Sequence, residues 1–318
     1  SYLWADTYPM DSYYMSLVST DADNNIYMTS EIHLSSGSVN IGSVVLSQTP
    51  DDGATVLIKF DPDGTPLWAK TYGGVSGASE SDGWPTDINN DADGNTYLWG
   101  WCLNNAEFDA FTLANPITAE PSVYSYYLAK IDENGDVVWA EGVYETASYG
   151  MNYGDLMDLD ANGNIYVGGH FRNKINIQGT EFTPAGTNDF FTARFGNDGT
   201  FEWIKTIPST GTICYSLDVS DEDVVTIGSY AGKDAALGAF PYERKGGPTG
   251  IVATMGTLGY ITVTAGDPII IEAPLNSTGS FTIASNTSWT IESGQPWLVP
   301  DLSSGTGNAT ITLTAQEH

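Results

Sequence analysis

Two short acidic runs have the residue types and spacing of a calcium-binding loop. Residues 89–94 (Asn-Asn-Asp-Ala-Asp-Gly) and 158–163 (Asp-Leu-Asp-Ala-Asn-Gly) place oxygen-bearing side chains at alternate positions before a glycine, and hard cations favour such clusters. An EF-hand also needs a bidentate glutamate at the twelfth position, which is Gly100 in the first run and Gly169 in the second. We therefore interpret both runs as hairpin turns, with calcium binding as the alternative, and expect no metal or cofactor.

Groups suited to covalent or acid–base catalysis are scarce. The chain has three histidines, His33, His170 and His318, and lacks both the Gly-x-Ser-x-Gly nucleophile elbow and the His-Glu-x-x-His zinc motif. Its 40 acidic residues produce close carboxylate pairs by chance, so spacing cannot identify a glycosidase dyad. We predict that the protein is not an enzyme. The alternative, a hydrolase or lyase, would gather carboxylates around His33 or His170.

Aromatic side chains are the best candidates for ligand binding. Residues two apart on a strand share a face, so Trp99 and Trp101 project together, with Trp84 upstream and Tyr126 in a tyrosine-rich run at 124–127. Aromatic faces stack on sugars and fill interface pockets. We predict that Trp84, Trp99, Trp101 and Tyr126 bind a ligand. The alternative is that these rings fill space beside small residues of neighbouring elements.

The aromatic residues lie within an internal repeat. Segments 21–28, 91–98 and 160–167 match one another, and their tyrosines lie 70 (27 to 97) and 69 (97 to 166) residues apart. Each segment is followed by a second block with an Asp-Gly or Asn-Gly pair and then a tryptophan. The tryptophans of these blocks are Trp68, Trp139 and Trp203. A fourth, degraded copy runs from residue 214 to 255 and has no tryptophan, so the chain contains four repeats of unequal quality.

Each repeat predicts two antiparallel hairpins, because alternating strands flank turns that supply positive φ angles. Four antiparallel strands form one blade of a β-propeller. The fourth repeat lacks its last strand, and residues 3–7 (Leu-Trp-Ala-Asp-Thr) match residues 67–71 (Leu-Trp-Ala-Lys-Thr). We therefore predict an all-β fold whose residues 1–259 form a four-bladed β-propeller. The N-terminal strand closes the ring and leaves no open edge.

The repeat resembles a known bacterial family. Residues 164–169 (Asn-Ile-Tyr-Val-Gly-Gly), 191–195 (Phe-Thr-Ala-Arg-Phe) and 203–205 (Trp-Ile-Lys) are similar to the β-propeller repeats named SBBP, and the likeness covers roughly residues 1–259. The resemblance implies a secreted or cell-surface scaffold.

Residues 260–318 differ from the repeats in their sequence pattern and predict a second domain. Short threonine-rich strands alternate with turn residues, as in an immunoglobulin-like β-sandwich, but 59 residues are fewer than the about 80–100 that such a sandwich needs. Residues 286–291 (Asn-Thr-Ser-Trp-Thr-Ile), 296–299 (Pro-Trp-Leu-Val) and 305–310 (Gly-Thr-Gly-Asn-Ala-Thr) resemble the BACON domain of Bacteroidota surface proteins. We predict a partial BACON-like sandwich whose two tryptophans belong to its core.

Charge and hydropathy restrict the partners. The 40 acidic residues against 10 basic ones give a net charge of −30, which repels phosphate backbones and excludes nucleic-acid binding. Such acidity fits solubility outside the cell. No stretch approaches 18 apolar residues, so we expect no transmembrane segment. We expect a secreted or outer-membrane protein, lipid-anchored through a segment that is not in this chain.

The leading functional hypothesis is a non-catalytic recognition scaffold at the cell surface. The resemblance to SBBP repeats and BACON domains implies an accessory lipoprotein of an outer-membrane nutrient-uptake system, with a protein partner in that complex. One alternative is a surface glycan-binding protein that uses the aromatics of the second repeat. The other is a propeller hydrolase or lyase.

Overall fold

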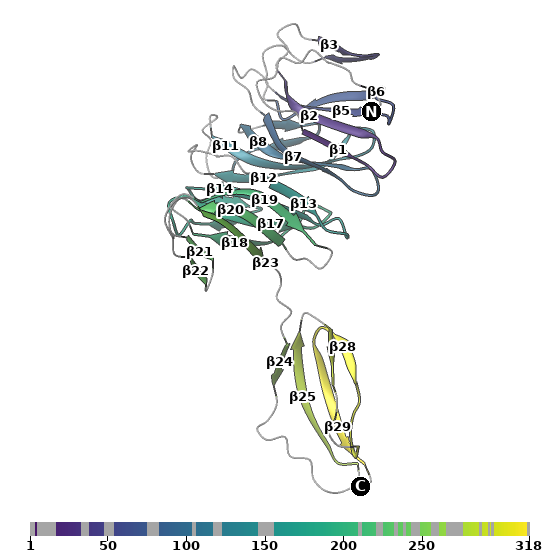
Figure 1. Cartoon of the computed structure of the whole chain (residues 1–318), viewed down its shortest axis with the longest axis vertical. Coiled ribbons are helices and arrows are strands. Elements are labelled where there is room, and N and C mark those ends of the chain that lie inside the picture. Colours follow the sequence, from purple (N-terminus) through teal and green to yellow (C-terminus); the bar gives the residue numbers. More distant parts are fainter. Residues whose placement is uncertain are drawn as a thin grey trace. The chain divides into compact units, whose positions relative to one another are not determined.

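The computed structural model consists of two compact units, residues 1–254 and 255–318, which are described separately (Figure 1). The residues that it describes are 4, 17–32, 38–47, 54–74, 83–103, 106–116, 123–145, 156–208, 212–220, 225–231, 235–237, 240–242, 249–255, 261–264, 276–285, 288–291, 293 and 296–316. In these ranges the regular elements are all β-strands, and the sheets are antiparallel, so the predicted all-β class is confirmed. None of these residues belongs to a helix long and apolar enough to cross a membrane.

The first three repeats each fold into a four-stranded meander. The first sheet contains β1 (Leu17–Thr20), β2 (Ile26–Ile32), β5 (Ala54–Phe60) and β6 (Pro66–Tyr72). The second contains β7 (Gly83–Asn90), β8 (Thr96–Leu103), β11 (Tyr124–Ile131) and β12 (Val137–Glu145). The third contains β13 (Leu156–Leu159), β14 (Ile165–Phe171), β17 (Asp189–Phe195) and β18 (Phe201–Ile207). The predicted strand content of these repeats is thus present.

The fourth repeat forms a sheet of three strands within the described residues. These are β19 (Thr212–Val219), β20 (Val225–Ala231) and β23 (Thr249–Met255). The sequence predicted that residues 3–7 supply the missing strand. Those residues lie outside the described part of the chain, apart from Trp4.

Aspartate-led turns join the strands, as the sequence predicted. At the turn between β7 and β8, Asp91 Oδ1 accepts hydrogen bonds from the backbone amides of Asp93 (3.0 Å) and Asn95 (2.9 Å). Gly94 completes this turn with a φ of +81°, a left-handed conformation that favours glycine. The same pair of amide bonds recurs at four other turns, those of Asp21, Asp61, Asp132 and Asp160.

A short hairpin stands between the second and third strands of every repeat, and the sequence did not predict it. These hairpins are β3–β4 (Ser38–Ile41 and Val44–Ser47), β9–β10 (Ala106–Phe108 and Phe111–Leu113), β15–β16 (Ile175–Ile177 and Thr180–Phe182) and β21–β22 (Ala235–Leu237 and Phe240–Tyr242). Two of them pair with the preceding repeat. Strand β15 pairs with β12 and extends the second sheet to six strands, and the Gly73 amide at the end of β6 donates to the Glu107 carbonyl of β9 (2.7 Å).

The core lies between successive sheets. Alternate residues of a strand point to opposite faces. On β8, Tyr97 and Trp99 therefore join the cluster shared with the third repeat, whereas Leu98 and Cys102 join the cluster shared with the first. Both faces of the second sheet are thus covered, which explains why almost every residue of β8 and β11 is buried.

The second unit holds a smaller sheet. Its strands, in spatial order, are β24 (Ile261–Thr264), β25 (Thr278–Ser285), β29 (Ala309–Ala315) and β27 (Leu298–Pro300), beside a two-stranded ribbon of β26 (Ser288–Thr290) and β28 (Ser304–Thr306). Trp289 packs with Ile283 and Ile311, and its indole donates to the Gly307 carbonyl (2.8 Å). The predicted core role of Trp289 is confirmed by its 5 % exposure.

Candidate functional site

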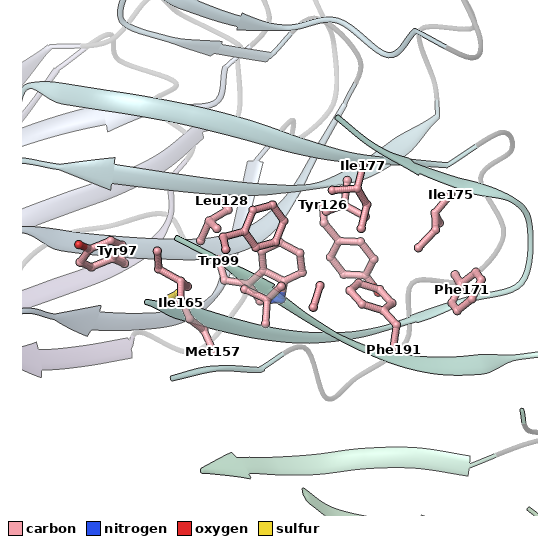
Figure 2. Close-up of a cluster of buried hydrophobic side chains, with 14 residues drawn as sticks. Tyr97, Trp99, Tyr126, Leu128, Met157, Ile165, Phe171, Ile175, Ile177 and Phe191 are labelled. Carbon is pink, nitrogen blue, oxygen red and sulfur yellow. The ribbon is translucent and has the colours of Figure 1, made fainter. Parts of the chain in front are cut away.

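Trp99 and Tyr126 form the centre of the aromatic face of the second sheet. The two rings stack in parallel, with centroids 4.9 Å apart and an interplanar angle of 2°. Both side chains are 0 % exposed and belong to the core cluster between the second and third repeats. Figure 2 shows them side by side, with Phe191 of the third repeat next to Tyr126.

Main-chain groups of β14 satisfy the polar atoms of both rings. The Trp99 indole donates to the Gly168 carbonyl (3.2 Å). The Tyr126 hydroxyl donates to the His170 carbonyl and accepts from the His170 amide (2.9 Å each). A side chain at Gly169 would place its Cβ 2.8 Å from Tyr126 Cζ, so the close approach depends on glycine.

This geometry corrects the interpretation of Trp99 and Tyr126 as ligand-binding residues. A fully enclosed ring presents no face to a solute, so these two side chains act in packing. The alternative was that the rings fill space beside small residues of a neighbouring repeat. Trp99 does so, because it packs beside Gly168 of the third repeat.

Trp84 and Trp101 lie on the same face but are only half-buried. They are directly opposite each other on β7 and β8, and their rings meet edge to face at 6.4 Å. Tyr124, at the start of β11, lies 5.2 Å from the Trp84 ring at an interplanar angle of 53° and is also half-buried. We call Trp84, Trp101 and Tyr124 the aromatic corner. Tyr124 was missing from the predicted site, although the tyrosine-rich run 124–127 pointed to it.

A second constellation recurs in each of the first three repeats. In the second repeat the Tyr97 hydroxyl donates to Asp91 Oδ2 (3.0 Å), and Lys130 Nζ lies 3.8 Å from that oxygen and 5.2 Å from the centre of the tyrosine ring. Trp139 meets Tyr97 edge to face at 6.3 Å. Matching tyrosine contacts join Lys59 and Trp68 to Tyr27, and Arg194 and Trp203 to Tyr166. Sequence reasoning missed the cations, whose signal was a basic residue two positions before each second turn.

Two members of these clusters, Asp21 and Tyr97, have shifted pKa values. Burial acts to raise the pKa of the Asp21 carboxyl, but hydrogen bonds from Asn25 and the charge of Lys59 outweigh it, and the pKa is lowered. Burial, followed by the Asp91 charge, raises the pKa of Tyr97 above its ordinary value. Tyr97 therefore remains a hydrogen-bond donor, and the Asp21 carboxylate an acceptor, at neutral pH.

The same groups bear on the calcium interpretation. Both carboxylate oxygens of Asp91 accept hydrogen bonds, and the Lys130 ammonium lies beside them. Among the described residues, no three His, Cys, Asp or Glu side chains form a group that could hold a metal ion. Asp91 is thus a turn residue whose carboxylate already lies beside the ammonium group of Lys130.

The clusters of the first and second repeats also contact the repeat that follows each of them. The Trp139 indole donates to the Asn197 carbonyl (3.2 Å), and Lys130 Nζ donates to Asn197 Oδ1. One repeat earlier, the Trp68 indole donates to the Glu133 carbonyl (3.0 Å). Aspartate, tyrosine, cation and tryptophan together are therefore an inter-repeat clamp that contacts the second turn of the next repeat.

Half-buried polar groups on the first strands of the second and third repeats make similar contacts with the next repeat. Asp87 Oδ2 accepts from the Met157 amide (2.9 Å), and Asn89 Nδ2 donates to the Met157 carbonyl (3.0 Å). Burial raises the pKa of Asp87 to about 6, although hydrogen bonds from the backbone amides of Met157 and Ile88 oppose this shift. Asp158 accepts from the Val219 amide (2.7 Å) in the same way.

The two internal histidines differ in what the structure describes. His170 is 1 % exposed, with its ring 5.2 Å from that of Phe190. His33 lies outside the described residues.

Comparison with known proteins identifies no family. No family model and no curated protein matches the chain. Among solved structures, the crystal structure of polysaccharide lyase Uly1 matches with a TM-score of 0.31 and 10 % sequence identity, over 95 % of this chain and 58 % of that one. The chain thus spans little more than half of that protein's length. A similarity at this level supports no conclusion about fold or activity.

Proposed function

We propose that this protein is a non-catalytic recognition scaffold of the bacterial cell surface, built as a four-bladed β-propeller closed by its N-terminal strand and followed by a partial immunoglobulin-like module. The observation that carries the proposal is the use of the repeat's polar residues. Aspartate, tyrosine and cation are engaged in turns and in the clamp between repeats. Repetition therefore makes a stiff support, and recognition is left to residues that differ between repeats.

The proposed setting rests on the resemblance to SBBP repeats and BACON modules. It is an outer-membrane nutrient-uptake system in which this chain, as a secreted or lipid-anchored accessory protein, binds a protein partner. The net charge of −30 favours partners other than nucleic acids.

Affinity purification from outer-membrane extracts tests this setting. Transporter subunits should be recovered with the full chain in stoichiometric amounts. An untagged strain processed in parallel is the control, and recovery of no membrane transporter would contradict the setting. A panel of glycan and peptide substrates tests the non-catalytic part, since turnover of any of them would establish the hydrolase or lyase alternative.

The aromatic corner favours a second candidate function, glycan binding. Its three rings are half-buried, belong to one repeat only, and are held at fixed angles by their mutual contacts. Rigid aromatic rings with partly accessible faces are typical of surfaces that stack on sugar rings. Trp99 and Tyr126 would support this surface from the core.

Affinity electrophoresis on immobilised polysaccharides tests the second candidate. The full chain should be retarded, and Trp84→Ala or Trp101→Ala should abolish the retardation. Phe182→Ala, which removes a half-buried ring of the third repeat, should keep it. Equal retardation of all variants would contradict a glycan site at the aromatic corner.

A further inference from the structure

The cluster of the second repeat differs from the other two in the groups that its cation meets. Lys130 Nζ donates to Asn197 Oδ1, the oxygen of a side-chain carboxamide in the third repeat. In the first repeat, Lys59 Nζ donates instead to the main-chain carbonyl of Glu133 (3.4 Å). In the third repeat the cation is the guanidinium of Arg194. Of these three described clusters, the second is therefore the one that places a primary amine against a carboxamide.

The groups around this contact suit a reaction between the amine and the carboxamide. Lys130 Nζ lies 3.8 Å from Asp91 Oδ2, and both side chains are 11 % exposed. The Tyr97 hydroxyl lies 3.0 Å from Asp91 Oδ2 and 3.3 Å from Asn197 Oδ1, within hydrogen-bond distance of each. A carboxylate that can accept a proton thus lies beside the amine, and a hydroxyl donor lies beside the carboxamide oxygen.

Neighbouring residues hold the amine and the carboxamide in place. Lys130 Nζ lies 5.2 Å from the centre of the Tyr97 ring. The Trp139 indole donates to the main-chain carbonyl of Asn197 (3.2 Å). A Cβ added to Gly163 would lie 2.6 Å from Asn197 Nδ2, so the carboxamide lies directly against glycine backbone. Fixing two reactive groups in contact greatly raises the rate of a reaction between them.

We propose that Lys130 and Asn197 form an isopeptide bond, which joins the second and third repeats covalently. Asp91 Oδ2 takes a proton from the Lys130 ammonium, and the free amine attacks Cγ of Asn197 as a nucleophile. The Tyr97 hydroxyl stabilises the negative charge that develops on Oδ1.

The reaction is completed by loss of the amide nitrogen. Asp91 gives its proton to Nδ2 and takes the proton that Nζ loses, while the bond between Cγ and Nδ2 of Asn197 breaks. Ammonia leaves and carries the last proton away as ammonium, and Asn197 is exposed, so solvent is within reach of this small product. An ammonium group and a carboxamide are thereby converted into a secondary amide and an ammonium ion, and no group is oxidised or reduced.

Mass spectrometry of the full chain tests the bond. The intact mass should be lower than the sequence mass by one molecule of ammonia. Trypsin does not cleave after an acylated lysine, so digestion should release residues 71–172 linked to residues 195–205. A chain of full sequence mass, whose two peptides are separate and cleaved after Lys130, would overturn the proposal.

A succinimide would give the same loss of mass and must be distinguished. The Asn-Gly pairs at 134–135 and 162–163 are the sequences in which such a ring forms most readily, and both lie within residues 71–172. A succinimide leaves residues 195–205 as a separate peptide. An ammonia deficit confined to residues 71–172 would therefore also overturn the proposal.

Substitutions test the role of each group. Lys130→Arg keeps a cation beside Asp91 but removes the amine, so it should restore the full sequence mass. Asp91→Asn keeps an oxygen for the turn amides but removes the proton acceptor. It should slow the appearance of the linked peptide after cell-free synthesis on the order of a hundredfold, the usual size of a proton-transfer contribution.

The first repeat supplies matched controls. Lys59→Arg and Asp21→Asn make the same two changes in a cluster that has no carboxamide partner, and they should leave the linked peptide unchanged. Linking at equal rates in the Asp91→Asn and Asp21→Asn variants would contradict the proton transfer assigned to Asp91. None of these results depends on the ligand or partner of the protein, so the recognition function is judged separately.

Discussion

The aromatic face of the second sheet contains two regions of similar composition and different exposure. Trp99 and Tyr126 are fully enclosed, and every polar atom on their rings meets the backbone of β14. Trp84 and Trp101, on the same face, are half-buried and contact each other edge to face. Residue type therefore does not decide how far a ring is enclosed. In this sheet the enclosed rings are those that lie against the glycine backbone of β14.

The largest expected effect is on the enclosed region. Trp99→Ala removes a stacked ring and leaves the Gly168 carbonyl without its indole donor, so we expect a loss of about 3–5 kcal/mol in the free energy of unfolding. Urea unfolding followed by far-UV circular dichroism measures it. Trp99→Phe, which keeps a stacked ring, should lose less. A loss of under about 1 kcal/mol for Trp99→Ala would remove the distinction between the two regions.

Asp87 extends the comparison to polar groups of β7. Its pKa rises from an ordinary value of 3.8 to about 6 in the fold, so the folded state holds this proton more tightly than the unfolded state. The contribution of Asp87 to stability is therefore greatest below pH 4, falls as the pH rises to about 6, and is constant above that. The Asp87→Asn variant lacks this pH-dependent contribution to stability but keeps a side-chain oxygen that can accept from the Met157 amide.

Unfolding measured at pH 4.5 and pH 7.5 tests the Asp87 prediction. The stability of Asp87→Asn relative to the unsubstituted chain should increase between the two pH values, by on the order of 2 kcal/mol. Asp63→Asn, which changes an exposed turn carboxylate in the same way, is the matched control. A pH-independent difference for Asp87→Asn would show that the fold does not raise the pKa of this carboxyl group.

Substitutions in the inter-repeat clamp should lower the free energy of unfolding by a smaller amount. Trp139→Phe keeps an aromatic ring against Gly199 but removes the indole donor to the Asn197 carbonyl, so we expect a loss of about 1 kcal/mol. Trp68→Phe should behave alike, because its indole has the equivalent partner. Val138→Ala, an exposed neighbour on the same strand, is the control. If all three variants retain full stability, the hydrogen bond adds nothing to the interface.

The smallest effect on stability is expected at the aromatic corner. Trp84→Ala removes a half-buried ring whose described contacts are with Trp101 and Tyr124, so its cost should remain below about 1 kcal/mol. The same urea titration as for Trp99→Ala gives the direct comparison. A cost equal to that of Trp99→Ala would mean that the corner is part of the core and not a surface for ligands.

Much of the fold could be predicted from the sequence because the signals are local. The turn aspartates and glycines sit at fixed offsets, and the alternating strands follow from their spacing, as at Asp91 and Gly94. The inserted hairpins were missed because strands of three residues, such as β9 and β15, carry too few positions to show a period.

The site was harder to predict because its determinants are distant in the sequence. Whether Trp99 is enclosed depends on Gly168, 69 residues away, and no pattern within β8 reports that contact. The pairing of Lys130 with Asn197 likewise joins two repeats. By contrast, the two-residue periodicity correctly predicted that Trp99 and Trp101 share a face.

The indole hydrogen bonds have a consequence for how the sequence can diverge during evolution. The indoles of Trp4, Trp68 and Trp139 each donate to a main-chain carbonyl. The residues that supply these carbonyls are chemically unrelated, namely proline, glutamate and asparagine at positions 62, 133 and 197. The indole hydrogen bond thus requires only that the turn present its carbonyl in the right position, and it tolerates different side chains at the acceptor residue. Neighbouring units can diverge on their outward faces, or be duplicated and exchanged, while the joint between them stays the same.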